Sequence, residues 1–397
     1  MVPRPFHIEI ETSVLDDLRQ RLERTRWAKV LPDDNWDAGT RPAYLRDIVA
    51  YWRDAYDWRG QEARLNALPH FKVRIDEADL HFVHVRGEGP KPTALLLLHG
   101  WPDSFLRFQR VLEPLASKGF DLVVPSFPGF AFTGPVRYAS PAQTMRQAAG
   151  WFQRLMTDVL GYRRFAVAGG DGGSVAAQLM ALDHPESVIG IHLTDIGWHA
   201  WNIDKESATH AERKFLDAAM AGFMKDGGYA MVQKSTPRSL APGLNDSPAG
   251  LASWILDRFH SWTDGDLAKR FDRDELLTNI MLYWVTQTIG SSFQGYNEEA
   301  RAPSITPADR IGRPAALALF PRDIGGIPPR ELAERTLDVR RWTEMPRGGH
   351  FAAWEEPELY AADVAAFFAS LEADSGSEEA SRARPPVRNP RSRLDAR

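Results

Sequence analysis

The stretch from Phe165 to Ser174 constrains the fold more than any other part of the sequence. It begins as an apolar run rich in β-forming residues, passes through a cluster of glycines and leads directly into a helix-like run. A strand that enters a helix through such a sharp turn is typical of a nucleophile elbow, whose usual pattern is Gly-x-Ser-x-Gly. Gly169 and Gly173 occupy the glycine positions, where a side chain would collide with the neighbouring helix or strand, and Asp171 occupies the serine position.

The aspartate at this turn narrows the chemistry. A serine that attacked a saturated carbon would form an ether, which is a dead end, whereas a carboxylate forms an alkyl ester that water can open at the aspartate's own carbonyl carbon. The pattern therefore favours a substrate with a leaving group on sp³ carbon, either an epoxide or an alkyl halide. The alternative is that Gly-Gly-Asp-Gly-Gly is a turn that only reverses the chain.

Composition excludes several other classes of protein. The 397 residues carry a net charge of −5, which gives no reason to expect a nucleic-acid or membrane partner. Cysteine is absent, so disulfides, thiolate nucleophiles and cysteine-based metal sites are excluded. The N-terminus lacks an apolar signal region, and no apolar segment reaches the roughly 20 residues that a membrane span requires. We therefore expect a soluble, cytoplasmic protein that needs no cofactor or metal.

Strands alternate with helices on both sides of the elbow, which predicts an α/β fold with a mostly parallel sheet and helices on both faces. The strands are expected at 71–75, 80–85, 94–98, 120–124, 165–169, 188–193, 315–320 and 337–342. The longer helices are expected at 13–26, 44–56, 105–115, 141–160, 276–289 and 356–371.

The alternation stops after the strand at 188–193, where a long helical and irregular block is typical of an inserted lid. The predicted division of the chain is an N-terminal helical extension with a first hairpin (1–88), the first part of the core (89–196), the helical lid (197–308), the second part of the core (309–372) and a disordered tail (373–397). The tail is assigned from its Ser-, Pro- and Arg-rich composition.

A catalytic triad on this topology runs in the order nucleophile, acid, histidine. Asp171 comes first, and His350 follows two glycines after the last predicted strand. Asp323 follows the strand before it and would fix the imidazole tautomer. Glu355 and Glu356 are rival acids, although they begin a helix that they could cap instead.

From about Phe6 to Leu371 the chain resembles the microsomal epoxide hydrolase family of α/β-hydrolases. The stretches that carry the resemblance are His99-Gly100-Trp101-Pro102, 121–130, Gly169-Gly170-Asp171, 276–284 and 347–358. The resemblance implies that Asp171 opens an epoxide ring and that His350, oriented by Asp323, activates the water that cleaves the resulting ester.

The resemblance also implies an oxyanion hole and lid tyrosines. The backbone amides of Trp101 and Gly172 would form the oxyanion hole, and the Trp101-Pro102 peptide bond is expected to be cis. Tyr296 would be the lid tyrosine that donates a proton to the epoxide oxygen. The first lid tyrosine is expected within 251–256, where Trp254 stands as a donor-only substitute that binds substrate.

Several points stay open at this stage. Tyr283 and Tyr229 are further tyrosines in the lid, to which we assign a structural role. Aromatic lid residues favour a bulky apolar or aryl epoxide, and the oligomeric state, including a homodimer, is open. A haloalkane or haloacid dehalogenase would use the same nucleophile, and a catalytically silent binding protein would use the same fold.

Overall fold

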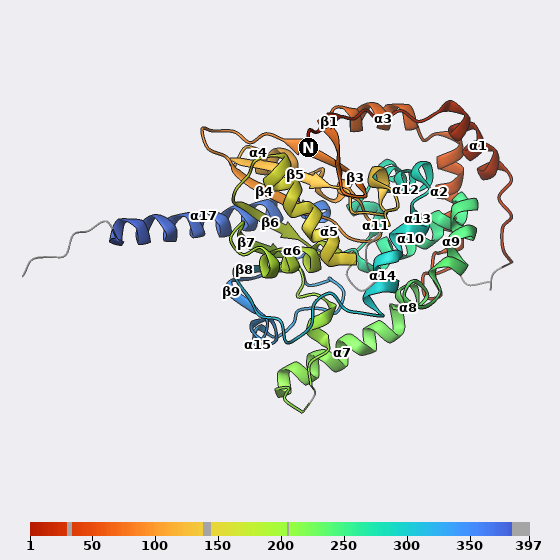
Figure 1. Ribbon diagram of the computed structural model, residues 1–397. Coiled ribbons are helices and arrows are strands. Elements are labelled where there is room, and N and C mark those ends of the chain that lie inside the picture. Colours follow the sequence, from red (N-terminus) through yellow and green to blue (C-terminus); the bar gives the residue numbers. More distant parts are fainter. Residues whose placement is uncertain (30–33, 138–143, 205, 383–397) are drawn as a thin grey trace, which may run out of the picture.

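The computed structural model describes residues 1–29, 34–137, 144–204 and 206–382, with the side chains of 374–382 excepted (Figure 1). A nine-stranded sheet with the order β1-β2-β3-β5-β4-β6-β7-β8-β9 forms the centre of the fold. The strands are β1 (Arg4–Pro5), β2 (His70–Ile75), β3 (Ala78–Val85), β4 (Thr93–Leu98), β5 (Phe120–Pro125), β6 (Phe165–Gly169), β7 (Val188–Leu193), β8 (Ile311–Leu319) and β9 (Leu337–Glu344).

The first strands pair antiparallel, from β1 through β2 and β3 to β5, and the strands from β5 to β9 pair parallel. The predicted α/β fold with a mostly parallel sheet is therefore confirmed. Because parallel strands end at the same edge of a sheet, the loops after β4, β6, β7, β8 and β9 gather their side chains there.

Strand β4 shows why the apolar runs of this sequence form central strands. Leu95 and Leu97 belong to one hydrophobic core, while Leu96 and Leu98 belong to another. Side chains alternate across a strand, so a continuous apolar run buries both faces of the sheet. Helices cover these faces on either side (Figure 1). They are α4 (Leu112–Ala116), α5 (Thr144–Arg154), α6 (Gly172–Asp183), α15 (Arg330–Glu334), α16 (Ala352–Glu355) and α17 (Pro357–Arg382).

The lid is the chain between β7 and β8. Its helices are α7 (His210–Asp226), α8 (Gly228–Ser235), α9 (Pro237–Asp246), α10 (Pro248–Trp262), α11 (Leu267–Arg270), α12 (Arg273–Thr286), α13 (Ile289–Ser292) and α14 (Gln294–Glu299). Within the described ranges, no helix has the length and apolar character that crossing a membrane demands.

The N-terminal helices α1 (Thr12–Glu23), α2 (Pro42–Asp54) and α3 (Trp58–Asn66) pack on the lid (Figure 1). The hydroxyl of Tyr51 donates to Asp274 on α12 at 2.8 Å. The guanidinium of Arg21 contacts the carboxylate of Asp246 on α9 at 2.6 Å. The extension therefore fixes the position of the lid from outside.

The predicted helix at 105–115 is divided into a 3₁₀ turn, Phe105–Phe108, and α4. Pro114 explains the division, because its ring would clash with the carbonyl of Arg110 in a continuous helix and is tolerated only in a first turn. The predicted helix at 141–160 appears as α5 followed by a π-helical turn at Leu155–Val159, and residues 141–143 lie outside the described residues.

Helix α17 extends to Arg382, past residue 373, where the sequence predicted a disordered tail. Residues 372–380 include several Glu and Ala residues with high helix propensity. A helix that packing has already nucleated adds such residues at little cost. Residues 383–397 of the predicted tail lie outside the described residues.

Candidate active site

The elbow between β6 and α6 places Asp171 in a strained backbone conformation, with φ 55° and ψ −128°. Two glycines allow this close approach. A Cβ at Gly100 would lie 2.4 Å from the Cβ of Asp171, and a Cβ at Gly173 would lie 2.0 Å from the carbonyl oxygen of Leu98. Both positions tolerate only glycine, which the sequence pattern had predicted for Gly173 but not for Gly100.

The three predicted triad residues meet at the carboxyl edge of the sheet. His350 Nδ1 and Asp323 Oδ1 are 2.7 Å apart, and His350 Nε2 lies 3.7 Å from Asp171 Oδ2. The rival acids are engaged elsewhere. Glu355 accepts hydrogen bonds from the backbone amides of Phe351 and Asp264, and Glu356 pairs with arginines.

His350 is set up to accept a proton from water. Burial lowers its pKa, but the neighbouring carboxylate of Asp323 more than offsets this, and the pKa of His350 is raised. Its Nε2 is buried and has no hydrogen-bond partner among the described residues. Since Asp323 holds Nδ1 as the donor, Nε2 is left as the free acceptor.

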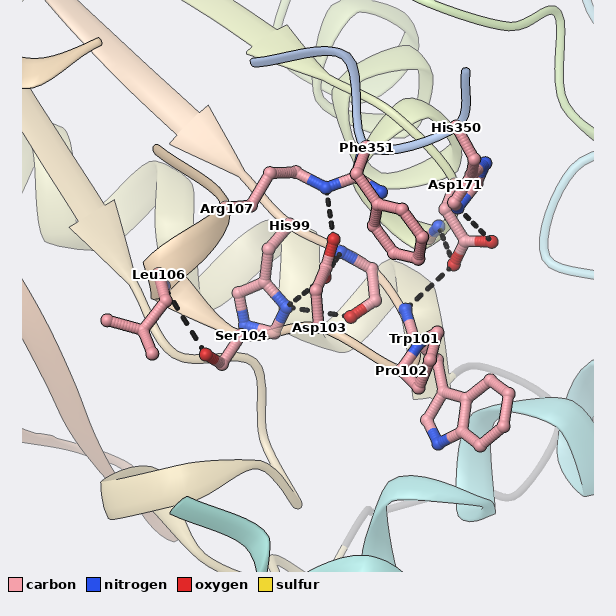
Figure 2. A network of polar contacts seen from close by, with 12 residues as sticks. His99, Trp101, Pro102, Asp103, Ser104, Leu106, Arg107, Asp171, His350 and Phe351 are labelled. Atoms are coloured by element: carbon pink, nitrogen blue, oxygen red, sulfur yellow. Dashed lines mark hydrogen bonds and ion pairs between the residues drawn. The ribbon is translucent and has the colours of Figure 1, made fainter. Parts of the chain in front are cut away.

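The two backbone amides that were predicted to form an oxyanion hole meet at Asp171. The backbone amides of Trp101 and Gly172 donate to the same oxygen, Asp171 Oδ1, at 3.1 and 2.6 Å. The Trp101-Pro102 peptide bond is cis, as expected. One carboxylate oxygen of Asp171 is therefore held by backbone, and the other faces His350 (Figure 2).

A buried polar network supports the loop that carries Trp101 (Figure 2). Asp103 accepts from the backbone amide of Gly100 at 2.9 Å and forms an ion pair with Arg107. From the lid, the Asn279 side chain donates to the carbonyl oxygen of Pro102 at 2.8 Å. Buried hydrogen bonds of this kind restrict the position of the loop and hence of its amide.

Two lid tyrosines, Tyr229 and Tyr296, pack against Trp101 and against each other. Tyr296 packs edge-on to Trp101, with ring centroids 6.1 Å apart. Tyr229 is 6.0 Å from Tyr296 between ring centroids, and each affects the pKa of the other. The hydroxyl of Tyr283 already donates its proton to the carbonyl oxygen of Asp103 at 2.7 Å, so it is not available as a donor to substrate.

Trp254, expected at the place of the first lid tyrosine, does not line the cavity that contains Asp171. It lies on α10 and packs half-buried against the apolar core between lid and N-terminal helices. Tyr229, on the first turn of α8, instead packs against Trp101 and Tyr296. No local pattern marks Tyr229, because its position depends on how α8 packs against α14.

Comparison with known proteins agrees with this geometry. Residues 3–108 match the family described as epoxide hydrolase N terminus, and residues 93–357 match the α/β-hydrolase fold. Epoxide hydrolase 1 of Sus scrofa is 34% identical over 93% of this chain and 89% of its own length. The chain belongs to the microsomal epoxide hydrolase family.

Other members of the family are similar to this chain in sequence or in structure over most of its length. Juvenile hormone epoxide hydrolase 1 of Ctenocephalides felis is 33% identical over 91% of this chain and 84% of its own length. The crystal structure of the Bombyx mori juvenile hormone epoxide hydrolase superposes with a TM-score of 0.85 at 26% identity, covering 94% of this chain and 95% of the other. The structure of the Aspergillus niger epoxide hydrolase superposes with a TM-score of 0.82 at 27% identity, covering 94% of this chain and 97% of the other.

This member of the epoxide hydrolase family also carries a third carboxylate beside the triad, which sequence reasoning missed. Asp195 follows β7 and accepts from the backbone amides of Asp171 at 2.7 Å and Gly197 at 2.9 Å. Burial and, after it, the charge of Asp323 raise the pKa of Asp195 to about 7. An acidic residue directly after a predicted strand was the available signal.

A cavity of about 310 Å³ opens onto Asp171 and the lid tyrosine Tyr296. Its wall is largely apolar near the elbow, with a polar group of side chains from the lid. The lining residues relevant to binding are Trp101, Phe127, Phe130, Met145, Asp171, Val175, His199, Lys234, Tyr296, Glu299 and Ile305. Its size is at the lower end of the range of small-molecule sites.

Proposed function

We propose that the protein hydrolyses epoxides to vicinal diols through a covalent ester on Asp171. The arrangement of the Asp171 carboxylate carries this proposal. Its Oδ1 is held by two backbone amides, while its Oδ2 lies 3.7 Å from His350 Nε2. Membership of the family supports the same reaction, since its named relatives from Sus scrofa and Ctenocephalides felis are epoxide hydrolases.

In the first step, Oδ2 of Asp171 attacks a ring carbon, and the bond between that carbon and the epoxide oxygen breaks. The oxygen leaves as an alkoxide and takes a proton from Tyr296 or Tyr229. Burial raises the pKa of both phenols, so both remain protonated donors at neutral pH. An alkoxide is basic enough to take a phenolic proton as it forms.

In the second step, His350 removes a proton from water at Nε2, and the hydroxide attacks Cγ of Asp171. The negative charge that develops on Oδ1 is stabilised by the amides of Trp101 and Gly172, at roughly 3–4 kcal/mol for each donor. The bond from Cγ to the alkyl oxygen then breaks. That oxygen takes the proton back from His350, and the diol leaves with one oxygen from Asp171. The proton left on the regenerated Asp171 carboxyl returns to the tyrosinate that formed in the first step.

An isotope experiment tests the covalent route. A single turnover with enzyme in excess, in ¹⁸O-labelled water, should place the label in the Asp171 carboxylate and leave the first diol unlabelled. Peptide mass spectrometry after digestion locates the label, and the Asp171→Asn variant serves as control. Label in the first diol would show direct attack of water and contradict the proposal.

A dehalogenase is the second candidate, and one observation favours it. The indole Nε1 of Trp101 is buried and unpartnered in the described part of the chain, so it could donate to a halide. Halide release from alkyl halides without turnover of epoxides would support this reaction. A chain inert toward both substrate classes would instead support a silent binding protein.

The apolar part of the cavity supports an apolar or aryl body for the substrate. Phe127, Phe130 and Met145 line this part, and their area favours burial of a hydrophobic group. Competition between aryl and linear alkyl epoxides of equal size tests the preference. The cytoplasmic location and a homodimer remain predictions, which cell fractionation and light scattering test.

A further inference from the structure

One wall of the cavity carries polar groups that the two-step mechanism does not use. His199 is only 6% exposed, lines the cavity and has no hydrogen-bond partner at either ring nitrogen among the described residues. A buried polar group without a partner costs free energy, so such a group calls for an explanation. Burial lowers the pKa of His199 to about 4, so the ring is neutral at pH 7 and offers one N–H donor.

Lys234 stands beside His199 and places a cation in the same wall. Its ammonium lies over the rings of Trp198, at 5.1 Å, and Phe223, at 5.3 Å. Trp198 begins the short helix Trp198–Trp201 that contains His199. The short helix that carries His199 therefore also contacts the ammonium of Lys234 on α8.

The ammonium of Lys234 has no carboxylate within 4.0 Å in the part of the chain that the structure describes, and burial lowers its pKa. Its backbone is fixed as well, since the Asn297 side chain on α14 donates to the Lys234 carbonyl at 2.6 Å. A half-buried cation in a fixed position without an anionic partner is suited to receive one from a ligand.

Glu299 lines the same cavity but is not the anionic partner of Lys234. Its Oε2 accepts from the backbone amide of Ser304 at 2.8 Å, and its Oε1 accepts from the hydroxyl of the same residue. Burial raises the pKa of Glu299, which favours its neutral form and weakens its repulsion of a bound anion.

We propose that the cavity selects epoxides that carry a carboxylate on the arm away from the ring, and that Lys234 and His199 bind this carboxylate. The inference rests on the proposed function, because it concerns the substrate of the same cavity. One cation and one neutral donor suit a monoanion. A phosphate dianion would leave charge uncompensated in a cavity that already contains Asp171.

The test compares terminal epoxides of ω-alkenoic acids, over a series of chain lengths, with their primary amides of equal shape. At the best chain length, kcat/KM should favour the acid by about tenfold or more, as expected for hydrogen bonds to a charged group. Lys234→Met should reduce this ratio to about one, and His199→Phe should reduce it in part. Lys225→Met, an exposed lysine on α7, should retain it.

Two further measurements keep the outcome decisive. If the Met variant folds poorly, Lys234→Gln provides a second measurement of the preference for the acid over the amide. If turnover is slow, the ratio of the competitive inhibition constants of the product acid and the product amide measures the same preference. Equal or better turnover of the amide by the natural chain, or an unchanged ratio in both Lys234 variants, overturns the inference alone. Failure to hydrolyse any epoxide, neutral ones included, overturns the proposed function and the inference with it.

Discussion

The phenol ring of Tyr229 lies parallel to the indole ring of Trp101, with their centroids 5.2 Å apart and an angle of 4° between the planes. The backbone amide of Trp101 donates to Asp171, so this stacking couples the position of a lid tyrosine to the oxyanion hole. An aromatic contact thus joins the lid to the residue whose amide holds the nucleophile. Tyr296 completes the contact from α14.

From this arrangement we expect both tyrosines to assist ring opening. Tyr229→Phe and Tyr296→Phe should each slow formation of the alkyl-enzyme by roughly tenfold to a hundredfold, because one donor to the alkoxide remains in each variant. The double variant should lose far more. Stopped-flow tryptophan fluorescence under single-turnover conditions measures this step separately from ester hydrolysis.

Trp254→Phe provides the matched control for the tyrosine variants. Since Trp254 packs away from the cavity, its substitution should change the rate of ring opening by less than about threefold, within the range of a remote packing change. A larger loss for Trp254→Phe than for Tyr229→Phe would return the donor role to the tryptophan.

The second step should depend on Asp323 through His350. In Asp323→Asn, the ester on Asp171 should still form, but its hydrolysis should slow by roughly 10²-fold or more, because the imidazole loses its oriented tautomer. Intact-protein mass spectrometry should then detect the accumulated alkyl-enzyme. The same variant removes the charge that raises the pKa of His350, so the acidic limb of the hydrolysis rate should move to lower pH.

The control for this step is Asp338→Asn on the partly exposed part of β9, which should leave both rate constants unchanged. An Asp323→Asn variant that hydrolyses its ester at the natural rate would show that another group orients His350. Glu355 would then be the residue to test, because burial raises its pKa to about 7 and it lies close to His350.

The sequence predicted the sheet and the triad because short-range constraints determine both. The apolar runs that form β4 and β6 are buried on both faces of the sheet, and only glycine fits at positions 169 and 173 around Asp171. His350 and Asp323 follow from strand order, since parallel strands end at one edge. The order of residues along the chain was therefore sufficient to identify them.

The lid could not be predicted with the same detail. The resemblance implied the first lid tyrosine within 251–256, and Trp254 was assigned to the cavity on that ground. The helical period of α10 predicts an apolar face but does not show which residue meets the cavity. Tyr229 reaches Trp101 only through the packing of α8 against α14, a contact between distant segments. Asp195 belongs to no motif, because its role depends on the amide of Asp171 in the turn after the neighbouring strand.

Gly100 should be as restrictive for activity as the elbow itself. In Gly100→Ala, the new Cβ would lie 2.4 Å from both Cβ and Oδ1 of Asp171, so the nucleophile or the oxyanion loop must move. We expect a loss of kcat/KM of about a hundredfold or more, since a displacement of 1 Å is costly in a preorganised site. Steady-state kinetics measures the loss, and circular dichroism confirms folding.

The matched glycine variant is Gly222→Ala, on the exposed surface of α7. No atom lies within 4 Å of its added Cβ, so it should leave activity intact and stabilise the helix by about 0.5–1 kcal/mol. Full activity in Gly100→Ala would show that the close approach of this loop to Asp171 is not needed.

Asp195 should make the stability of the fold depend on pH. Its pKa of about 7 in the folded protein is above the unfolded value of about 3.9. A carboxyl with a raised pKa in the folded state destabilises that state once the unfolded chain has lost the proton. The contribution of Asp195 to stability is therefore fully present below about pH 4 and is lost as pH rises through about 7.

We therefore expect Asp195→Asn to remove the loss of stability that the natural chain shows as pH rises from about 4 to about 7. The free energy of unfolding of the variant, relative to the natural chain, should rise between pH 4.5 and pH 8 by roughly 2 kcal/mol or more, since one pKa unit corresponds to about 1.4 kcal/mol. Urea unfolding at both pH values measures the difference. The amide can still accept one of the two backbone hydrogen bonds, so a uniform loss of stability at all pH values would be a separate effect. A difference that stays constant with pH would mean that Asp195 is ionised in the fold, with its charge fully compensated by the amides of Asp171 and Gly197.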